Sequence, residues 1–372
     1  MKEAILTQEE QMLLALLRAA LAGKAPEAQA FDGATPADWE RCYRLAARHG
    51  VRALAWDGLA LLPPALLPPR ALRLLWGADT CRVEEQHRRY CRAAHELTAL
   101  FADNGIATVL LKGTGLSTCY PVPAHREGGD IDLYTYSAAP SALDNAHANR
   151  LADLLAEDRG MEVDRKHSEK HSLFYYKGIP VENHHTFLDT DKYRSAARLE
   201  ERLHRVLNPQ PLELPDGGGQ VWVPSPEFNT LFLAYHAIQH YGAGLSLHHL
   251  CDWACFVSRY GLRLPSDLDD AKFLGAVEAF TTLARTCLGV DVPDPGLPMP
   301  PGLDKKMLHE VLHSPFAREV PHTGKAAILW YKLRRMLHRL HVRRDVLDET
   351  LTRGIGEAIR VHWKNPETLF KR

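Results

Sequence analysis

An acidic motif at residues 128–133 places the strongest constraint on how this chain can fold. It reads Gly-Gly-Asp-Ile-Asp-Leu, with polar and apolar residues alternating as in a strand that has one buried face. The two aspartates, Asp130 and Asp132, should therefore project from one side, while the apolar residues enter a core. Two carboxylates this close repel each other and need a positive charge between them. The motif thus predicts a site for a divalent cation with oxygen ligands.

The chain is long enough for a large core and for more than one domain. It has 372 residues, 45% of them hydrophobic, and a domain usually takes roughly 100 to 200 residues. Its 45 Lys and Arg residues are balanced by 46 Asp and Glu residues, which gives a formal net charge of -1. This balance argues against a global attraction to nucleic acid or to an anionic membrane.

The cysteine pattern and the first residues bear on the compartment. The seven cysteines include no CxxC pair, which favours reduced thiols. The chain starts with an acidic amphipathic segment rather than an apolar signal core, and no apolar run reaches the length of a membrane span. We therefore expect a cytoplasmic protein that is neither exported nor inserted into a membrane.

An apolar run of strand length, residues 106–111, ends abruptly in Lys112, Gly113 and Thr114. Glycine lets the backbone come close to a ligand at this point. Thr114 can cap a helix that starts near Gly115. Because the backbone N–H groups at a helix start attract anions, the turn is a candidate phosphate site.

Further strand and helix patterns follow the acidic motif. They predict a helix over about residues 141–157 and two strands, residues 171–176 and 179–186, joined by a Lys-Gly turn. The segment from the first apolar run to the last strand is therefore an α+β unit, with helical patterns before and after it.

The turn after a strand, the strand with paired acids and a later acidic strand together resemble the DNA polymerase β-type nucleotidyltransferase superfamily. More closely, Leu-Leu-Lys-Gly at 110–113, Tyr120-Pro121, Arg126 and the acidic motif resemble its largely uncharacterised bacterial branch, in which an LKG turn replaces the usual Gly-Ser. The resemblance extends loosely to residues 249–253. It implies a mixed sheet with helices on one face and transfer of a nucleoside monophosphate from an NTP, with release of pyrophosphate.

This resemblance assigns roles to the acidic residues. Mg²⁺ (or Mn²⁺) ions bound by Asp130 and Asp132 can hold a triphosphate and lower the pKa of an attacking hydroxyl. A third carboxylate completes such sites. We expect it to be Glu182, because a short strand puts Glu182 and His184 on one face, beside the aspartates in the family pattern. Asp164 is the alternative.

The resemblance also assigns a nucleotide-binding group. Lys112 and Arg126 are the expected cations for the terminal phosphates, although Arg126 can instead form a structural ion pair. Gly113 and Thr114 stand where the wider superfamily has Gly-Ser. Fifteen residues separate Thr114 from Asp130, a longer spacing than the family usually has. The hydroxyl of Ser117, one turn further on, is therefore the alternative to that of Thr114 as the phosphate contact.

Histidines and a basic stretch surround this predicted site. His236 and His240 share a helix face at the spacing of a zinc site, yet no HExxH pattern and no Cys cluster accompanies them. We expect them, with His184, to border a cleft for the acceptor. The alternative is that these histidines are packed in the core. Residues 166–171 form either a positive rim over the phosphates or a solvated charged face.

The expected fold is α+β, a small mixed β-sheet core flanked by N-terminal and C-terminal helical segments. We expect four regions: an N-terminal helical region (1–100), a nucleotidyltransferase core (101–190), a helical region that completes the cleft (191–290), and a Pro-rich connector with a basic helical tail (291–372). The tail helix, residues 325–344, is either a partner surface or a solvated basic helix.

The expected function is metal-dependent transfer of a nucleoside monophosphate from an NTP, with ATP as one candidate, to a hydroxyl acceptor. The acceptor is a small molecule, an RNA 3′ end or a protein side chain. The neutral charge balance favours a small acceptor over nucleic acid. The alternative is a catalytically silent protein of the same fold that binds a nucleotide or a partner.

Overall fold

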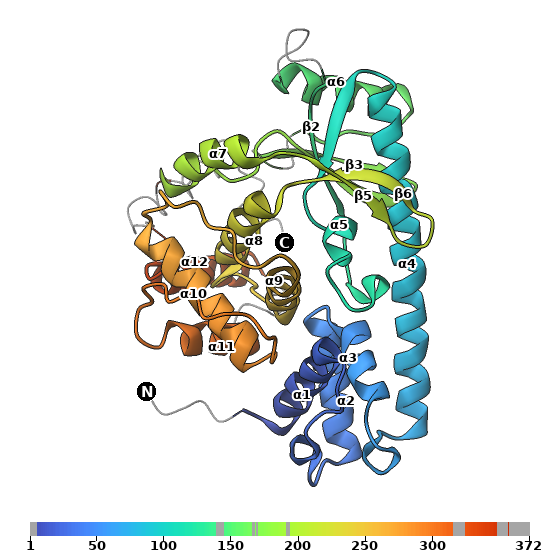
Figure 1. The fold of residues 1–372 in the computed structure, drawn as a ribbon, viewed down its shortest axis with the longest axis vertical. Helices are drawn as coiled ribbons and strands as arrows, with labels where there is room; N and C mark the ends of the chain where they lie inside the picture. Colours follow the sequence, from blue (N-terminus) through green and yellow to red (C-terminus); the bar gives the residue numbers. More distant parts are fainter. Residues whose placement is uncertain are drawn as a thin grey trace.

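A four-stranded mixed sheet lies at one end of the molecule, and helices make up most of the rest (Figure 1). The computed structural model describes residues 6–138, 145–165, 168, 170–190, 194–314, 324–347 and 356. The predicted α+β fold is confirmed. Whether the four predicted regions fold separately stays a prediction, and the boundary expected after residue 100 falls inside a helix that ends at Ala102.

The sheet has the strand order β1-β2-β4-β3. The two central strands, β2 and β4, run parallel, and each outer strand is antiparallel to its neighbour. The strands are β1 (Ile106–Leu110), β2 (Ile131–Ser137), β3 (His171–Tyr176) and β4 (Ile179–His184). The predicted strand pair after the acidic motif is confirmed, except that the second strand ends two residues earlier than expected.

The remaining elements are mainly α-helices. A separate antiparallel ribbon consists of β5 (Gln210–Leu214) and β6 (Gly219–Val223). The helices are α1 (Gln8–Ala22), α2 (Pro36–Arg48), α3 (Arg52–Ala60), α4 (Arg70–Ala102), α5 (Thr114–Ser117), α6 (Asn145–Asp158), α7 (Arg194–Val206), α8 (Pro226–His240), α9 (Leu247–Tyr260), α10 (Ala271–Thr286), α11 (Leu303–His313) and α12 (Lys325–Arg343), with short 3₁₀ turns η1 (Ala28–Phe31), η2 (Pro64–Leu66) and η3 (Pro123–His125).

One helix prediction is corrected by the structure, and another is only partly covered by the described residues. The helix after β1 is a single turn, and Gly113 rather than Thr114 is the residue that precedes its first turn. Gly113 has φ +64° and ψ −128°, a conformation open to glycine alone, so the chain turns sharply before a helix can extend. The predicted helix over 141–157 is found as α6, and its expected first turn lies outside the described residues.

Helix α4 connects the two ends of the molecule (Figure 1). It is 33 residues long and contacts α3 near one end and β1 and β6 near the other. Its buried Trp76 belongs to the helical core, whereas Leu97 and Phe101 pack in the core under the sheet. One rigid helix therefore links the N-terminal helices to the sheet.

The alternation in β2 places its apolar residues as predicted. Ile131 and Leu133 are buried on the face that packs against three alanines of α6, Ala148, Ala152 and Ala156. Small side chains let the helix lie close to the sheet. The opposite face, which carries the aspartate side chain of Asp132, is directed toward the C-terminal helices.

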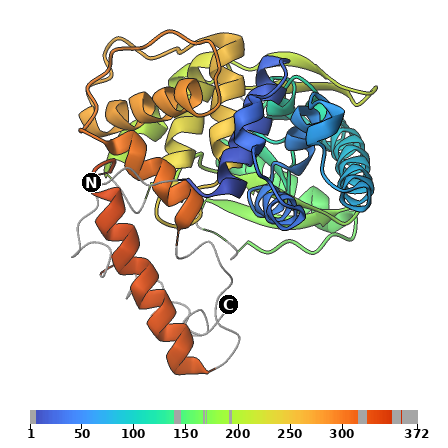
Figure 2. The same ribbon diagram turned by 90° about the horizontal axis from the view of Figure 1, so that it is seen from below.

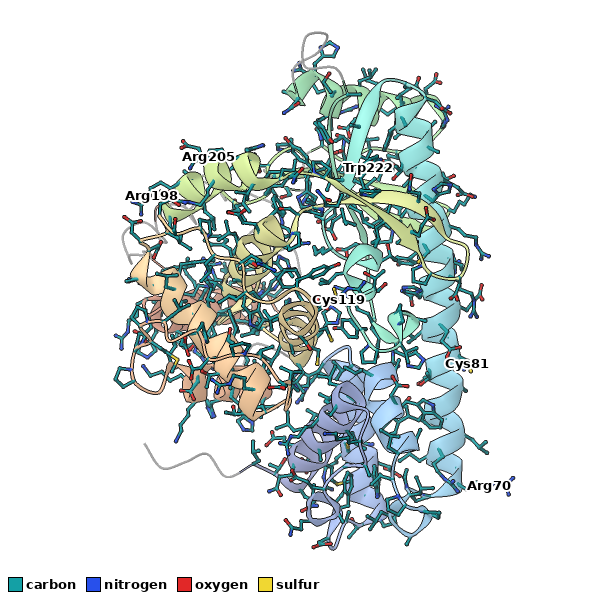
Figure 3. The ribbon with its side chains drawn as sticks, in the orientation of Figure 1. Arg70, Cys81, Cys119, Arg198, Arg205 and Trp222 are labelled. Carbon is teal, nitrogen blue, oxygen red and sulfur yellow. The ribbon has the colours of Figure 1, made fainter. Side chains whose placement is uncertain are left out.

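The outer helices show the same division between buried and solvent-facing sides. In α7, Leu199 and Leu203 are buried while Arg198 and Arg205 lie on its outer side (Figure 3). Figure 2 shows α12 projecting away from the body of the molecule. Near its C-terminal end, Arg343 donates from Nε to the backbone oxygen of Tyr241 at 2.7 Å. The tail helix is thus anchored at one end, and its role stays a prediction.

Two further features concern the compartment. None of the helices in the described part of the chain is long and apolar enough to cross a membrane. All seven cysteines are free thiols. The cytoplasmic location stays a prediction.

A buried ion pair ties the loop before β2 to α9. Arg126 donates from Nε to Oδ1 and from a terminal nitrogen to Oδ2 of Asp252, both at 2.8 Å. Tyr120 donates its hydroxyl to Oδ1 of the same carboxylate at 2.6 Å. Burial alone would raise the pKa of Asp252, but Arg126 holds it well below its usual range. The pair fixes the helical wall opposite the sheet.

We expect Arg126→Met to lower the free energy of unfolding by about 3–5 kcal/mol, because it leaves the buried carboxylate of Asp252 without its cation. Urea denaturation followed by circular dichroism measures this loss. Arg44→Met is the matched control, since Arg44 pairs with Glu40 at the surface and such pairs contribute about 0–1 kcal/mol. Equal losses in the two variants would contradict a structural role for Arg126.

Candidate active site

Three carboxylates meet where the start of β2 lies beside the middle of β4. Asp132 is directly paired in register with Glu182 across β2 and β4, and Asp130 immediately precedes β2. Oxygen atoms of the three side chains lie within 4.8 Å of one another. The structure therefore brings together the three acidic residues predicted from the sequence. The alternative third acid, Asp164, is exposed and joins β3 through its backbone, opposite Leu173.

Lys112 supplies the positive charge within this acidic group. Its Nζ lies 2.9 Å from Oδ2 of Asp132 and 3.8 Å from Oδ2 of Asp130. The turn that carries Lys112 is held to β2, because the backbone N–H of Leu111 donates to the backbone oxygen of Asp132 at 3.0 Å. The acidic motif predicted a positive charge between the aspartates, and Lys112 supplies one; the divalent cation stays a prediction.

The three carboxyl groups differ in their tendency to ionise. Burial alone would raise the pKa of Asp132, but the Lys112 ammonium and a hydrogen bond from His184 hold it well below its usual range. Burial and the charge of Asp132 raise the pKa of Asp130. Burial also opposes ionisation of Glu182, but the hydrogen bond from His184 and the positive charges of Lys112 and His171 together lower its pKa. Asp132 is thus the most firmly charged member.

His184 lies behind the carboxylates rather than in the open cleft. Its side chain is completely buried, and Nε2 lies 3.1 Å from Oδ1 of Asp132 and 3.3 Å from Oε2 of Glu182. Nδ1 of His171 also lies 3.3 Å from Oε2 of Glu182. The expectation that His184 borders an acceptor cleft is therefore corrected: this histidine orients two carboxylates from within the protein.

A cleft of about 560 Å³ opens over the acidic group, a size typical of small-ligand sites. Its walls come from the end of α2, the turn after β1, the loop before β2, the central strands, and helices α8 and α9. Its titratable lining consists of Arg48, His49, Lys112, Arg126, Glu127, Asp130, Lys170, His171, Glu182, His236, His240, His248, His249 and Asp252. Anionic and cationic groups thus face one space.

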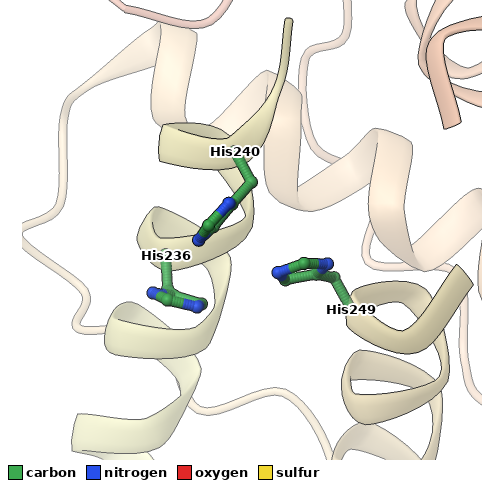
Figure 4. A group of neighbouring side chains, drawn as sticks. All are labelled: His236, His240 and His249. Atoms are coloured by element: carbon green, nitrogen blue, oxygen red, sulfur yellow. The ribbon is translucent and has the colours of Figure 1, made fainter. Parts of the chain in front are cut away.

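The predicted histidines of α8 line this cleft, and α9 adds a third. His236 and His240 lie one turn apart, and His249 faces them from α9 (Figure 4). Burial lowers the pKa of His240 to about 4 and moves the pKa of His236 and His249 well below its usual value. All three imidazoles are therefore neutral near pH 7.

The sequence of this chain matches a model of uncharacterised nucleotidyltransferases over residues 35–289, which is more than half of its length. The chain belongs to this family of uncharacterised nucleotidyltransferases. The match spans the whole cleft, from the end of α2 to α9. The bacterial branch named from the motifs stays a prediction.

Other comparisons add little to this family assignment. No curated protein matches the sequence. Among solved structures, an antigenic nucleotidyltransferase-like protein from Paracoccidioides brasiliensis is similar over 55% of this chain and 93% of its own, with 14% sequence identity and a TM-score of 0.35. A likeness this distant carries no argument about function.

The residues predicted to bind the nucleotide lie in different surroundings. Lys112 and Gly113 line the cleft, and Thr114 lines a smaller adjoining cavity of about 230 Å³. Ser117 is fully buried, donating to the backbone oxygen of Thr114 at 2.6 Å, and is left out of the site. Arg126 reaches the cleft, but its guanidinium is held by α9 as described above.

Several cleft residues of this family member were not predicted from the sequence. His249 and Asp252 were not singled out, because a histidine or an aspartate in an isolated helix has no local signature of a site. Lys170 was predicted only as part of a possible positive rim. It lines the cleft, whereas Lys166 and His167 of the same rim lie outside the described residues.

Neutralising the two aspartates should change stability in opposite directions. Asp132→Asn should lower the free energy of unfolding by roughly 3 kcal/mol, because it removes the buried partner of Lys112. Asp130→Asn should leave stability unchanged or raise it, because the fold disfavours this charge. Thermal unfolding at pH 7 measures both effects, and a matching loss in the two variants would contradict the assignment.

The effect at Asp132 should also depend on pH with a defined sign. The pKa of this carboxyl is depressed in the folded state, so its contribution is complete above the unfolded value of about 3.9 and is lost as the pH falls below it. The difference in melting temperature between wild type and Asp132→Asn should therefore shrink on acidification below about pH 4.

Proposed function

We propose that this member of the family transfers a nucleoside monophosphate from an NTP, with ATP as one candidate, to a hydroxyl acceptor and releases pyrophosphate. Asp130, Asp132 and Glu182 form the proposed reaction centre. The observation that carries the proposal is the register of β2 and β4, which sets Asp132 beside Glu182 at the floor of a ligand-sized cleft.

The acidic group fits a hard divalent cation. It offers only carboxylate oxygens, the donors that Mg²⁺ and Mn²⁺ prefer, and the Asp130 and Glu182 side chains are 35% and 19% exposed toward the cleft. When bound, Mg²⁺ would neutralise triphosphate charge and lower the pKa of the attacking hydroxyl. Asp130, Asp132 and Glu182 are the residues that would hold it.

The basic residues around the carboxylates prepare the cleft for a polyanion. Lys112 balances the acidic group from the β1–α5 turn, and Lys170 lines the same cleft. Burial, followed by the positive charge of Lys112, lowers the pKa of Lys170, so a phosphate between these two lysines would relieve their repulsion. The proposed nucleotide-binding group is therefore Lys112, Gly113 and Lys170, with Thr114 beside it.

The acceptor is proposed to be a small hydroxyl compound. The cleft wall opposite the carboxylates carries the neutral imidazoles of His236, His240 and His249 rather than a broad cationic surface. A nucleic-acid acceptor usually requires an extended basic surface. RNA and protein side chains are the other acceptors that the same chemistry could serve.

A second candidate function is nucleotide binding without catalysis. One observation favours it: Nζ of Lys112 already lies 2.9 Å from Asp132 and compensates the charge of this buried carboxylate without an added cation. In a silent protein this lysine would stay in place, whereas in the enzyme it would turn toward the phosphates of the bound nucleotide. Activity and binding measured together separate the two functions.

Asp130→Asn and Glu182→Gln should each reduce pyrophosphate release by at least about a hundredfold, because each removes a carboxylate that faces the cleft. The assay supplies each of the four NTPs with Mg²⁺ and a panel of hydroxyl acceptors, and detects pyrophosphate. Glu213→Gln, on the exposed ribbon strand β5, is the matched control and should behave as wild type. Near-normal turnover in both cleft variants would overturn the proposed centre.

The nucleotide should stabilise the fold mainly in the presence of Mg²⁺. At about a hundred times its dissociation constant, a ligand adds about 2.7 kcal/mol to the free energy of unfolding, which a thermal shift assay detects. The shift with NTP and chelator should be much smaller. Equal shifts with and without Mg²⁺, together with no turnover, would favour the silent function.

A further inference from the structure

Three imidazole rings from two helices face one another on the cleft wall (Figure 4). The ring centre of His240 lies 4.6 Å from that of His236 and 4.6 Å from that of His249, and the centres of His236 and His249 are 5.6 Å apart. One ring nitrogen from each residue lies within 4.8 Å of the other two. The sequence showed only the pair on α8, and a pair alone did not support a zinc site. The fold adds the third nitrogen.

The rings of His236 and His240 have nitrogen lone pairs that the surrounding protein does not satisfy. In the part of the chain that the structure describes, no hydrogen bond reaches a ring nitrogen of His236 or His240. Both side chains are only half-buried, and both are neutral near pH 7 for the reasons given above. Packed core histidines would instead point their nitrogens at hydrogen-bonding partners.

We propose that His236, His240 and His249 bind a transition-metal ion of the zinc class. The nitrogens around such an ion lie 2.0–2.1 Å from it and therefore roughly 3.4 Å from one another. Side-chain rotation alone can bring together three nitrogens that already lie within 4.8 Å. The bound ion would join α8 to α9.

Ser246 prepares His249 for this role. Its Oγ lies 3.0 Å from Nδ1 of His249, and its backbone N–H donates to the same nitrogen at 3.3 Å. Nε2 is therefore the nitrogen left for the metal, and its lone pair becomes available when the ring proton moves to Nδ1, where the Ser246 hydroxyl can accept the hydrogen bond. A hydrogen bond to the second ring nitrogen is the usual companion of a histidine ligand, because it fixes the tautomer and the ring orientation.

The donor atoms separate this site from the acidic group. Imidazole nitrogens select zinc, cobalt and similar ions, whereas carboxylate oxygens suit Mg²⁺. Three protein ligands leave one coordination position unfilled, and that position faces the cleft, which also contains Asp130 and Glu182. It would take a water molecule or a donor atom of the acceptor. The metal site does not depend on nucleotidyl transfer.

A second group of possible ligands, His171, Glu182 and His184, is less suited to an ion. Glu182 belongs to the carboxylate centre, and Nε2 of His184 is directed at Asp132 and Glu182. The members of this second group are thus already engaged in the carboxylate centre. The metal site is therefore assigned to the histidines of α8 and α9.

Co²⁺ binding followed by visible absorption tests the proposal. The full chain is freed of metal with a chelator, exchanged into buffer with excess Mg²⁺, and titrated with Co²⁺. Wild type should bind one Co²⁺ per chain with a visible absorption band, and Zn²⁺ should displace it. His249→Gln should weaken Co²⁺ binding by roughly a hundredfold or more. His309→Gln is the matched control, because His309 and His313 lie one turn apart on α11 and belong to no group of three ligands in the described part of the chain.

Further variants keep the result decisive. His240→Gln repeats the test should His249→Gln fail to fold, as judged by circular dichroism. Asp130→Asn should retain the Co²⁺ band, since its carboxylate belongs to the other group. Equal Co²⁺ affinity in wild type and a folded histidine variant would overturn the proposal. So would loss of the band in Asp130→Asn, which would assign Co²⁺ to the carboxylates.

Discussion

The ion pair between Lys112 and Asp132 is the interaction on which the site depends. A completely buried carboxylate costs several kcal/mol unless a cation and hydrogen bonds compensate it, and here Lys112 and His184 do so. Lys112 reaches Asp132 because it directly follows β1, which pairs with β2, and because the N–H of Leu111 donates to the backbone oxygen of Asp132; the chain then reverses at Gly113. The glycine turn, the lysine and the acidic strand therefore form one electrostatic unit.

A second buried ion pair sets the opposite wall of the cleft. Arg126 lies four residues before Asp130, and its partner Asp252 lies on α9, three residues after His249. The pair therefore fixes the acidic strand and the histidine wall at one distance from each other. Loss of this pair would separate the two walls even if each retained its own structure. Stability and the geometry of the cleft are in this way coupled.

The cleft combines two kinds of ligand that seldom compete for the same ion. Its floor offers the carboxylate oxygens of Asp130 and Glu182, and one wall offers the imidazole nitrogens of α8 and α9. Hard cations with bound phosphates favour the first set, and zinc-class ions favour the second. A nucleotide and an acceptor could thus be held by different chemistry within one space.

The sequence by itself determined the α+β fold and the alternation of β2, because the period of a strand is local and can be read from the chain alone. It also singled out Asp130 and Asp132, whereas Glu182, with Asp164 as the alternative, came from the family resemblance, and the catalytic role of these residues stays a prediction. Only the tertiary structure decided that Lys112 pairs with Asp132, that His184 is buried, and that His249 joins the histidines of α8. Such contacts join residues distant in the chain, and their energy comes from burial and charge neutralisation, for which a linear pattern carries no signature.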